Sequence, residues 1–123
     1  MKKTQIRKKI LKKRKYFNSK DIKINFSKII KLLNQEINTK KIGIYYPIGS
    51  EVSTIRLIEN LRNKKYIISL PVIEKNFKMS FYEWNKNSAL KINNFGIPEP
   101  FKLKKITPSV LIVPTVAFDA NLN

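Results

Sequence analysis

The clearest alternation of apolar and polar positions lies between residues 42 and 70. Residues 42–46 form a short apolar run that ends at a proline and a glycine, as a buried strand does at a turn. A helix capped by Ser53 is predicted next, from the helical spacing of Leu57, Ile58 and Leu61. A second apolar run, residues 66–70, ends at Pro71. Two buried strands joined by one helix pair in parallel, so the segment predicts a βαβ unit that binds ligands beyond the strands' carboxyl ends.

Two helices are predicted before the βαβ unit. The first, residues 3–15, carries a narrow apolar stripe beside a broad basic face. This stripe consists of Ile6, Ile10 and Leu11. The second helix, residues 19–37, is predicted with Asn18 or Ser19 as its cap. Its apolar residues recur as one continuous face, which we assign to the core: Ile22, Phe26, Ile29, Ile30, Leu33 and Ile37.

The remaining chain predicts further strands and one loop. Residues 72–78 indicate a polar connector, and residues 79–84 alternate as a strand with both faces partly covered. One glycine and two prolines in residues 93–100 predict a loop of extended geometry, and residues 110–113 predict a third buried strand. We therefore expect one α/β domain over residues 1–123. Because a helix normally follows the last central strand and covers the sheet, we expect this domain to be incomplete at its carboxyl end.

Composition excludes several kinds of chemistry. The 123 residues contain no Cys and no His, which excludes disulfides, thiolate nucleophiles, zinc sites of the usual kind and a histidine general base. The three glycines form neither phosphate-binding motif, GxGxxG or GxxxxGK[ST]. No apolar run is long enough for a signal peptide or a membrane span, so we expect a soluble cytoplasmic protein.

Two further readings stay open, and the net charge of +18 is the ground for the first. Basic surfaces attract phosphate polymers, so the alternative function is a small basic RNA-binding protein, although the chain has no RRM or KH signature. A third reading is a non-catalytic interaction module. The excess of Lys, together with many Ile and Asn residues, is also typical of the compositional bias of an AT-rich coding sequence.

Five short motifs occur in one order along the chain. They are Lys3-x-x-Ile6-Arg7, Tyr46 to Glu51 before a helix, Met79-x-Phe81, Gly96-Ile-Pro-Glu-Pro100, and Val113-Pro114 with Ala117-Phe118-Asp119. Together they resemble the 5-formyltetrahydrofolate cyclo-ligase family, also called 5,10-methenyltetrahydrofolate synthetase. The resemblance implies a three-layer α/β fold with an open parallel sheet, of the type shared with ribose-5-phosphate isomerase and glucosamine-6-phosphate deaminase. It also implies the ATP- and Mg²⁺-dependent conversion of 5-formyltetrahydrofolate into 5,10-methenyltetrahydrofolate.

The resemblance also implies site residues. Lys3 and Arg7, four apart on one helix face, would contact the phosphates of ATP. Glu51 would accept hydrogen bonds from the N–H groups of the pterin, with a helix-entry acid as the alternative. Further contacts to folate are assigned to Tyr46, Met79, Trp84, Phe95 and Glu99, with core packing as the alternative for the apolar ones. We expect the Lys–Arg pair and Glu51 to face the same cleft.

The chain departs from the family after Asp119. The family continues there with a glycine-rich Arg-Leu-Gly segment that holds ATP, folate and Mg²⁺, and that segment does not occur in residues 1–123. We therefore assign no catalytic residue and no metal ligand, and we expect no turnover from this chain by itself. The partners implied are ATP and 5-formyltetrahydrofolate, with no membrane and no specific nucleic acid, and the chain is expected to be a monomer.

Overall fold

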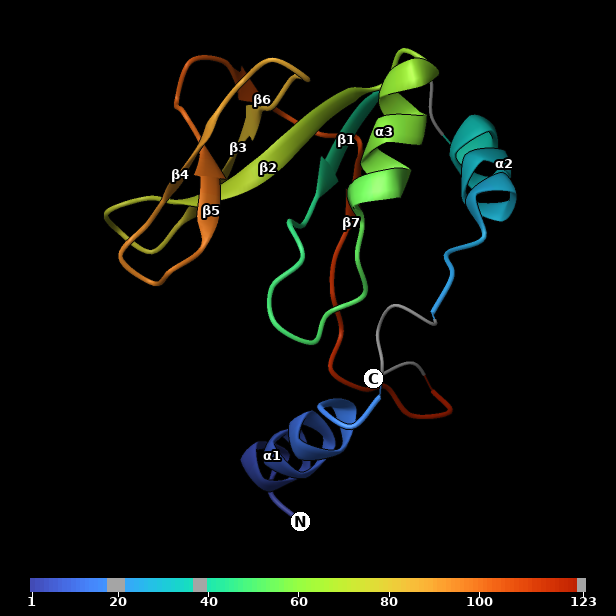
Figure 1. Ribbon diagram of the computed structural model, residues 1–123, viewed down its shortest axis with the longest axis vertical. Helices are drawn as coiled ribbons and strands as arrows, with labels where there is room; N and C mark the ends of the chain where they lie inside the picture. Colours follow the sequence, from blue (N-terminus) through green and yellow to red (C-terminus); the bar gives the residue numbers. More distant parts are fainter. Residues whose placement is uncertain (18–21, 37–39, 122–123) are drawn as a thin grey trace.

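The computed structural model describes residues 1–17, 22–36 and 40–121 (Figure 1). Its helices are α1 (Lys3–Arg14), α2 (Phe26–Glu36) and α3 (Ile55–Asn63). Its strands are β1 (Lys41–Ile44), β2 (Ile67–Ile73), β3 (Met79–Glu83), β4 (Leu90–Ile92), β5 (Pro98–Pro100), β6 (Lys105–Ile106) and β7 (Val110–Ile112). Five strands form one sheet in the order β6-β3-β2-β1-β7, and β4 pairs with β5 in a separate hairpin.

The five-stranded sheet is mostly parallel rather than purely parallel. β1 pairs in parallel with both β2 and β7, which confirms the predicted βαβ unit. β3 is antiparallel to β2, and β6 is antiparallel to β3, so β6 runs in the same direction as β2. The connection from β2 to β3 is a short turn, and a short turn joins strands only in antiparallel fashion.

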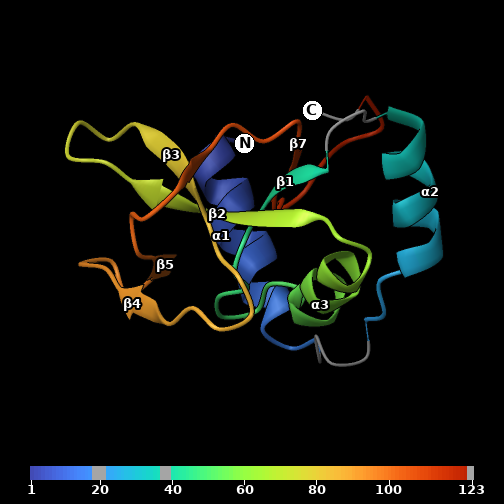
Figure 2. The ribbon, with the colours of Figure 1, turned by 90° about the horizontal axis from the view of Figure 1, so that it is seen from above.

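The hydrophobic core lies between β1, β2 and α3. Its buried residues include Ile42, Ile44, Leu57, Ile58, Leu61, Ile68 and Leu70, as the apolar pattern predicted. Leu33 of α2 is also buried in this cluster. Figure 2 shows α2 and α3 on the same side of the sheet. Alternate residues of a strand point to opposite faces, so this core takes every second residue of β1 and β2.

The second helix begins later than predicted. Residues 22–25 are described and are not helical, and α2 begins at Phe26. The Asn25 side chain accepts a hydrogen bond from the Lys28 backbone N–H at 3.1 Å, which is the geometry of a helix cap. Ile22 is therefore outside the helix and 52% exposed. The predicted caps Asn18 and Ser19, and the predicted core residue Ile37, lie outside the described residues.

β2 does not stop at Pro71 but continues to Ile73. β1 pairs with β2 as far as Ser69, whereas Pro71 pairs with Phe81 of β3. Beyond Ser69, β2 is paired with β3 on one side, and no described strand pairs with it on the other side. A proline, which has no N–H, is tolerated in a strand at such an edge.

Two further expectations are corrected. The predicted loop of residues 93–100 contains a turn followed by β5, which pairs with β4. The third predicted strand, β7, lies at the edge of the sheet, and Leu111 is 51% exposed.

The predicted helix α1 is confirmed, but none of its residues is buried. Figure 1 shows α1 beyond the carboxyl ends of β1 and β7, where its apolar stripe has no sheet to cover.

Within the described ranges, no helix combines the length and the apolar character that crossing a membrane requires.

Candidate functional site

A cleft of about 260 Å³ lies beyond the carboxyl ends of β1 and β7. This is the position at which α/β sheets bind ligands. Its polar lining consists of Arg14, Tyr45, Ser50, Glu51 and Thr115. Its apolar lining consists of Phe17, Ile22, Val52, Val113, Pro114 and Val116. The cleft is thus apolar with a few charged and polar groups, as small-molecule sites usually are.

Glu51 is fixed by the turn in which it lies. Its Oε2 atom accepts a hydrogen bond from the Ile48 backbone N–H at 3.0 Å, and its own N–H donates to the Ile48 carbonyl oxygen at 3.1 Å. Gly49, at φ +57°, supplies the left-handed conformation that this turn requires. The two hydrogen bonds hold the partly exposed Glu51 carboxylate beside the cleft that it lines.

Arg14 joins α1 to the same turn. Its Nε–H donates to the Ser50 hydroxyl oxygen at 2.9 Å. The Tyr45 hydroxyl donates to the Val52 carbonyl oxygen at 2.8 Å, which ties the far end of the turn to β1. Burial raises the pKa of Tyr45, Glu51 raises it further, and Arg14 opposes the rise. The Glu51 carboxylate and the Arg14 guanidinium therefore both act on the Tyr45 hydroxyl within one small site.

The structure brings α1 to the Glu51 cleft, but through Arg14 rather than through the predicted pair. Lys3 and Arg7 are exposed, and neither lines the cleft. Lys3 is four positions before Arg7 and eleven before Arg14, and both spacings place residues on one face of a helix. Lys3 and Arg7 therefore lie on the same face of α1 as Arg14, which contacts the turn. At about 1.5 Å per residue, Arg7 lies roughly 10 Å and Lys3 roughly 16 Å along the helix from Arg14. We did not predict Arg14 from the sequence, and its helical spacing from Lys3 and Arg7 is the one signal in the sequence that could have indicated it.

Tyr46 and Trp84 are brought together, but away from the Glu51 cleft. Their rings meet edge to face with centroids 5.9 Å apart, and both pack against the hydrophobic core. The Arg62 guanidinium lies 4.3 Å from the Trp84 ring centroid, and its terminal N–H donates to the Trp84 carbonyl oxygen. Burial lowers the pKa of Arg62, and Glu59 opposes this change. These contacts tie α3 to the end of β3.

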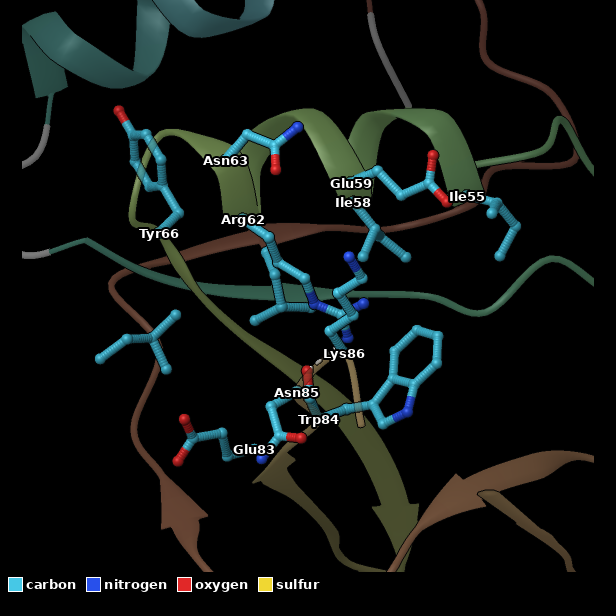
Figure 3. Close-up of a pocket in the computed structure, with 12 residues that line it drawn as sticks. Ile55, Ile58, Glu59, Arg62, Asn63, Tyr66, Glu83, Trp84, Asn85 and Lys86 are labelled. Carbon is cyan, nitrogen blue, oxygen red and sulfur yellow. Dashed lines mark hydrogen bonds between the residues drawn. The ribbon is translucent and has the colours of Figure 1, made fainter. Parts of the chain in front are cut away.

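A larger cleft, of about 730 Å³, lies between α3 and residues 83–86, and Figure 3 draws the residues that line it. The Arg62 side chain extends from α3 toward the Trp84 ring, and Glu59 lies along the same helix (Figure 3). The Nε of Arg62 is buried and has no hydrogen-bond partner among the described residues. The Arg62 guanidinium covers one face of the indole, and both side chains line the cleft between α3 and residues 83–86.

Phe95 and Glu99 line a third cleft, of about 460 Å³, between the β2–β3 turn and the β4–β5 turn. Glu99 is 5% exposed, and its Oε2 atom accepts a hydrogen bond from the Ile73 backbone N–H at 2.9 Å. Phe95 is 67% exposed, and Met79, on β3, is 61% exposed. Glu99 thus fastens the hairpin to the end of β2, while Phe95 and Met79 are exposed.

The sequence did not indicate the ion pair beside this cleft. The Lys102 ammonium contacts the Glu74 carboxylate, which also accepts a hydrogen bond from the Tyr82 hydroxyl at 3.1 Å. The hydrogen bond from Lys102 is the main cause that lowers the pKa of Glu74, and the same bond raises the pKa of Lys102. Residues 28 positions apart form this pair, so no local pattern predicts it.

Among the residues that the structure describes, no group of three or more acidic side chains is placed to hold a metal ion. Asp119 is exposed.

The chain matches the model of the 5-formyltetrahydrofolate cyclo-ligase family over residues 1–122. The chain belongs to this family. It is 31% identical over 98 residues to the 5-formyltetrahydrofolate cyclo-ligase of Haemophilus influenzae, an alignment that covers 74% of this chain and 52% of that enzyme. The chain thus spans about half the length of the curated relative it matches. These matches give no support to the RNA-binding alternative.

Two solved structures are similar to this one. The NMR structure of Aquifex aeolicus 5,10-methenyltetrahydrofolate synthetase superposes with a TM-score of 0.75 at 30% identity, covering 97% of this chain and 63% of that one. The 5,10-methenyltetrahydrofolate synthetase of Mycoplasma pneumoniae superposes with a TM-score of 0.64 at 20% identity, covering 96% of this chain and 66% of that one. The second likeness shows the fold alone. Both support the predicted mixed α/β fold with a mostly parallel central sheet.

Proposed function

We propose that residues 1–123 form the substrate-binding part of a 5-formyltetrahydrofolate cyclo-ligase, which converts 5-formyltetrahydrofolate into 5,10-methenyltetrahydrofolate with ATP. The observation that carries the proposal is the placement of Glu51 and the Arg14 face of α1 at one cleft, in a chain of this family. We also propose that the protein is a monomer in the cytoplasm. Its sheet is proposed to be of the ribose-5-phosphate isomerase type, with helices on both faces.

Folate binds at the Glu51 cleft in this proposal. The Glu51 carboxylate accepts hydrogen bonds from the pterin N–H groups, and charge-assisted bonds of this kind are strong. Val113 and Val116 supply apolar walls that suit a flat ring. The proposal assigns to Phe95 and Met79, both exposed, the contacts with the benzoyl group outside this cleft. Tyr46 and Trp84 act from the core by holding the strand ends.

ATP binds along the Arg14 face of α1. Lys3 and Arg7 lie on this face, and α1 has no acidic residue in its first turn to neutralise them. Exposed cations without acidic neighbours fit phosphate oxygens. Mg²⁺ is usually bound by one or two carboxylates together with the phosphates of its substrate, and the described residues contain no group of three or more acidic side chains that would mark a site. We therefore assign the ion no ligand in this chain and no step.

Binding of 5-formyltetrahydrofolate, measured by calorimetry, tests the folate half of the proposal. Glu51→Gln removes the charge but keeps the shape, so we expect affinity to fall about tenfold or more. Glu59→Gln, an exposed carboxylate on α3, is the matched control and should bind as the unmodified chain does. Equal affinities for both variants would show that Glu51 does not contact folate.

ATP binding tests the other half. The double substitution Lys3→Ala with Arg7→Ala should weaken ATP binding, because both cations lie on the face that Arg14 presents to the turn. Lys9→Ala with Lys12→Ala removes the same charge from the opposite face of α1 and is the control. Equal losses from both pairs would indicate general charge attraction instead of a site.

A further inference from the structure

The cleft between α3 and residues 83–86 is separate from the Glu51 cleft. The two clefts share no lining residue. The Trp84 backbone N–H donates to the Ile68 carbonyl oxygen at 2.9 Å, and Ile68 pairs with Ile42 near the amino ends of β2 and β1. The Glu51 cleft lies beyond the carboxyl end of β1, so a ligand bound near Trp84 would occupy neither proposed substrate site.

The lining of this second cleft combines apolar walls with charged and polar groups. Its volume of about 730 Å³ falls within the range of small-molecule sites. The apolar walls include Ile55 and Ile58 of α3 and the indole of Trp84. The charged and polar lining consists of Glu59, Arg62, Asn63, Glu83, Asn85 and Lys86. Such a lining fits a small molecule that has an apolar body and a charged end.

Arg62 is a half-buried cation, and none of the ion pairs within the described residues includes it. One of its terminal N–H groups donates to the Trp84 carbonyl oxygen, and its guanidinium lies 4.3 Å from the indole centroid. Both of these partners are neutral. Its Nε has no hydrogen-bond partner among the described residues. Because charges removed from water are normally paired, this guanidinium is suited to bind an anion from outside the chain.

The other charged groups around Arg62 leave room for such an anion. Glu83 already forms a 3.5 Å pair with Lys104. Glu59 raises the pKa of Arg62 without forming an ion pair with it, and the lowering by burial is the larger effect. Lys86 is exposed, and no described acidic group forms an ion pair with it. The cleft therefore offers two cations that no carboxylate of the described chain pairs with.

We propose that this cleft binds a small molecule in which a flat apolar ring carries one carboxylate or phosphate group. The Arg62 guanidinium and the Lys86 ammonium bind the anionic group, because the planar fork of arginine matches the oxygens of either anion. The ring of the ligand packs beside Ile55 and the Trp84 indole. The site shares no residue with the Glu51 cleft, so it stands independently of the proposed function.

Trp84 is the only tryptophan of the chain, so its fluorescence reports the occupancy of this cleft directly. The probes are benzoate, phenyl phosphate and the neutral benzyl alcohol, each titrated into the 123-residue chain at constant ionic strength. We expect a saturable change with at least one of the two anions. Benzyl alcohol should bind about tenfold more weakly or less, because it has no charge for Arg62 to pair with. The anion that binds more tightly identifies the charged group as a carboxylate or a phosphate.

Single substitutions assign the binding to the two cations. Arg62→Gln should weaken binding of the anion about tenfold or more, and Lys86→Gln about threefold. Arg56→Gln removes the same charge from an exposed position of α3 that does not line the cleft, and it is the matched control. Circular dichroism checks the fold of each variant. Glu51→Gln should leave anion binding unchanged, which separates this site from the proposed folate site.

Three outcomes would overturn the proposal. The first is the absence of a saturable change with either anion, and the second is equal binding of benzyl alcohol, which would show apolar attraction alone. The third is an equal loss in Arg62→Gln and Arg56→Gln, which would show general attraction of anions to a chain of net charge +18. If Arg62→Gln does not fold, the exposed Lys86→Gln makes the same comparison with Arg56→Gln.

Discussion

Replacing Glu99 separates a structural role from the ligand-binding role that the sequence indicated. Its carboxylate is buried and accepts the Ile73 N–H at 2.9 Å. Glu99→Ala leaves that N–H without its acceptor, which costs about 1–3 kcal/mol of the free energy of unfolding. For a domain of this size, each kcal/mol lowers the melting temperature by roughly 3–6 °C. Glu99→Gln keeps an oxygen that can accept the same bond, so it should lose less.

Urea unfolding, followed by the fluorescence of the chain's single tryptophan, measures these differences. Hydrogen exchange at the Ile73 amide reports the bond directly, and exchange should accelerate in Glu99→Ala. Glu83→Ala is the control, because Glu83 forms a 3.5 Å pair with the largely exposed Lys104, and such pairs contribute little. If Glu99→Ala is as stable as the unmodified chain and its Ile73 amide exchanges at the original rate, the structural role is wrong.

Three further predictions follow from the packing and the ion pair. Gly43→Ala places a methyl group against Leu111 and should destabilise the chain by about 1–3 kcal/mol, and Leu111→Ala in the same chain should recover part of this loss in thermal unfolding. Arg14→Gln should release α1 from the turn, seen as faster amide exchange in the helix with unchanged exchange in β1. The folded-state pKa of Glu74 lies below its usual value, so its contribution is present above about pH 4.5 and is lost as the pH falls through the folded pKa. Lys102→Met should reduce this dependence in acid titrations monitored by circular dichroism, and the Tyr82 hydrogen bond to Glu74 should maintain the remainder.

The local pattern predicted much of the fold because it depends on neighbours in the chain. The apolar run of residues 42–46, the helical spacing that follows and the run of residues 66–70 specify strand, helix and strand. A single crossover then allows essentially one arrangement of these elements, with parallel strands. The order of the short motifs was also sufficient to indicate the family, which the match over residues 1–122 confirms.

Only the tertiary structure decided which distant groups meet. Pro71 ends a strand in most sequences, but β1 does not extend beside it, so the missing N–H breaks no bond. Two residues further on, the Ile73 N–H points to the same edge of β2, and there Glu99 replaces the missing strand. Likewise, Arg14 is one basic residue among many until the turn at Ser50 is placed beside it. Spacing along the chain determines the helices and strands and their apolar faces. The partner of a polar group depends instead on which segments lie side by side in space, and the periodicity of the sequence does not encode this arrangement.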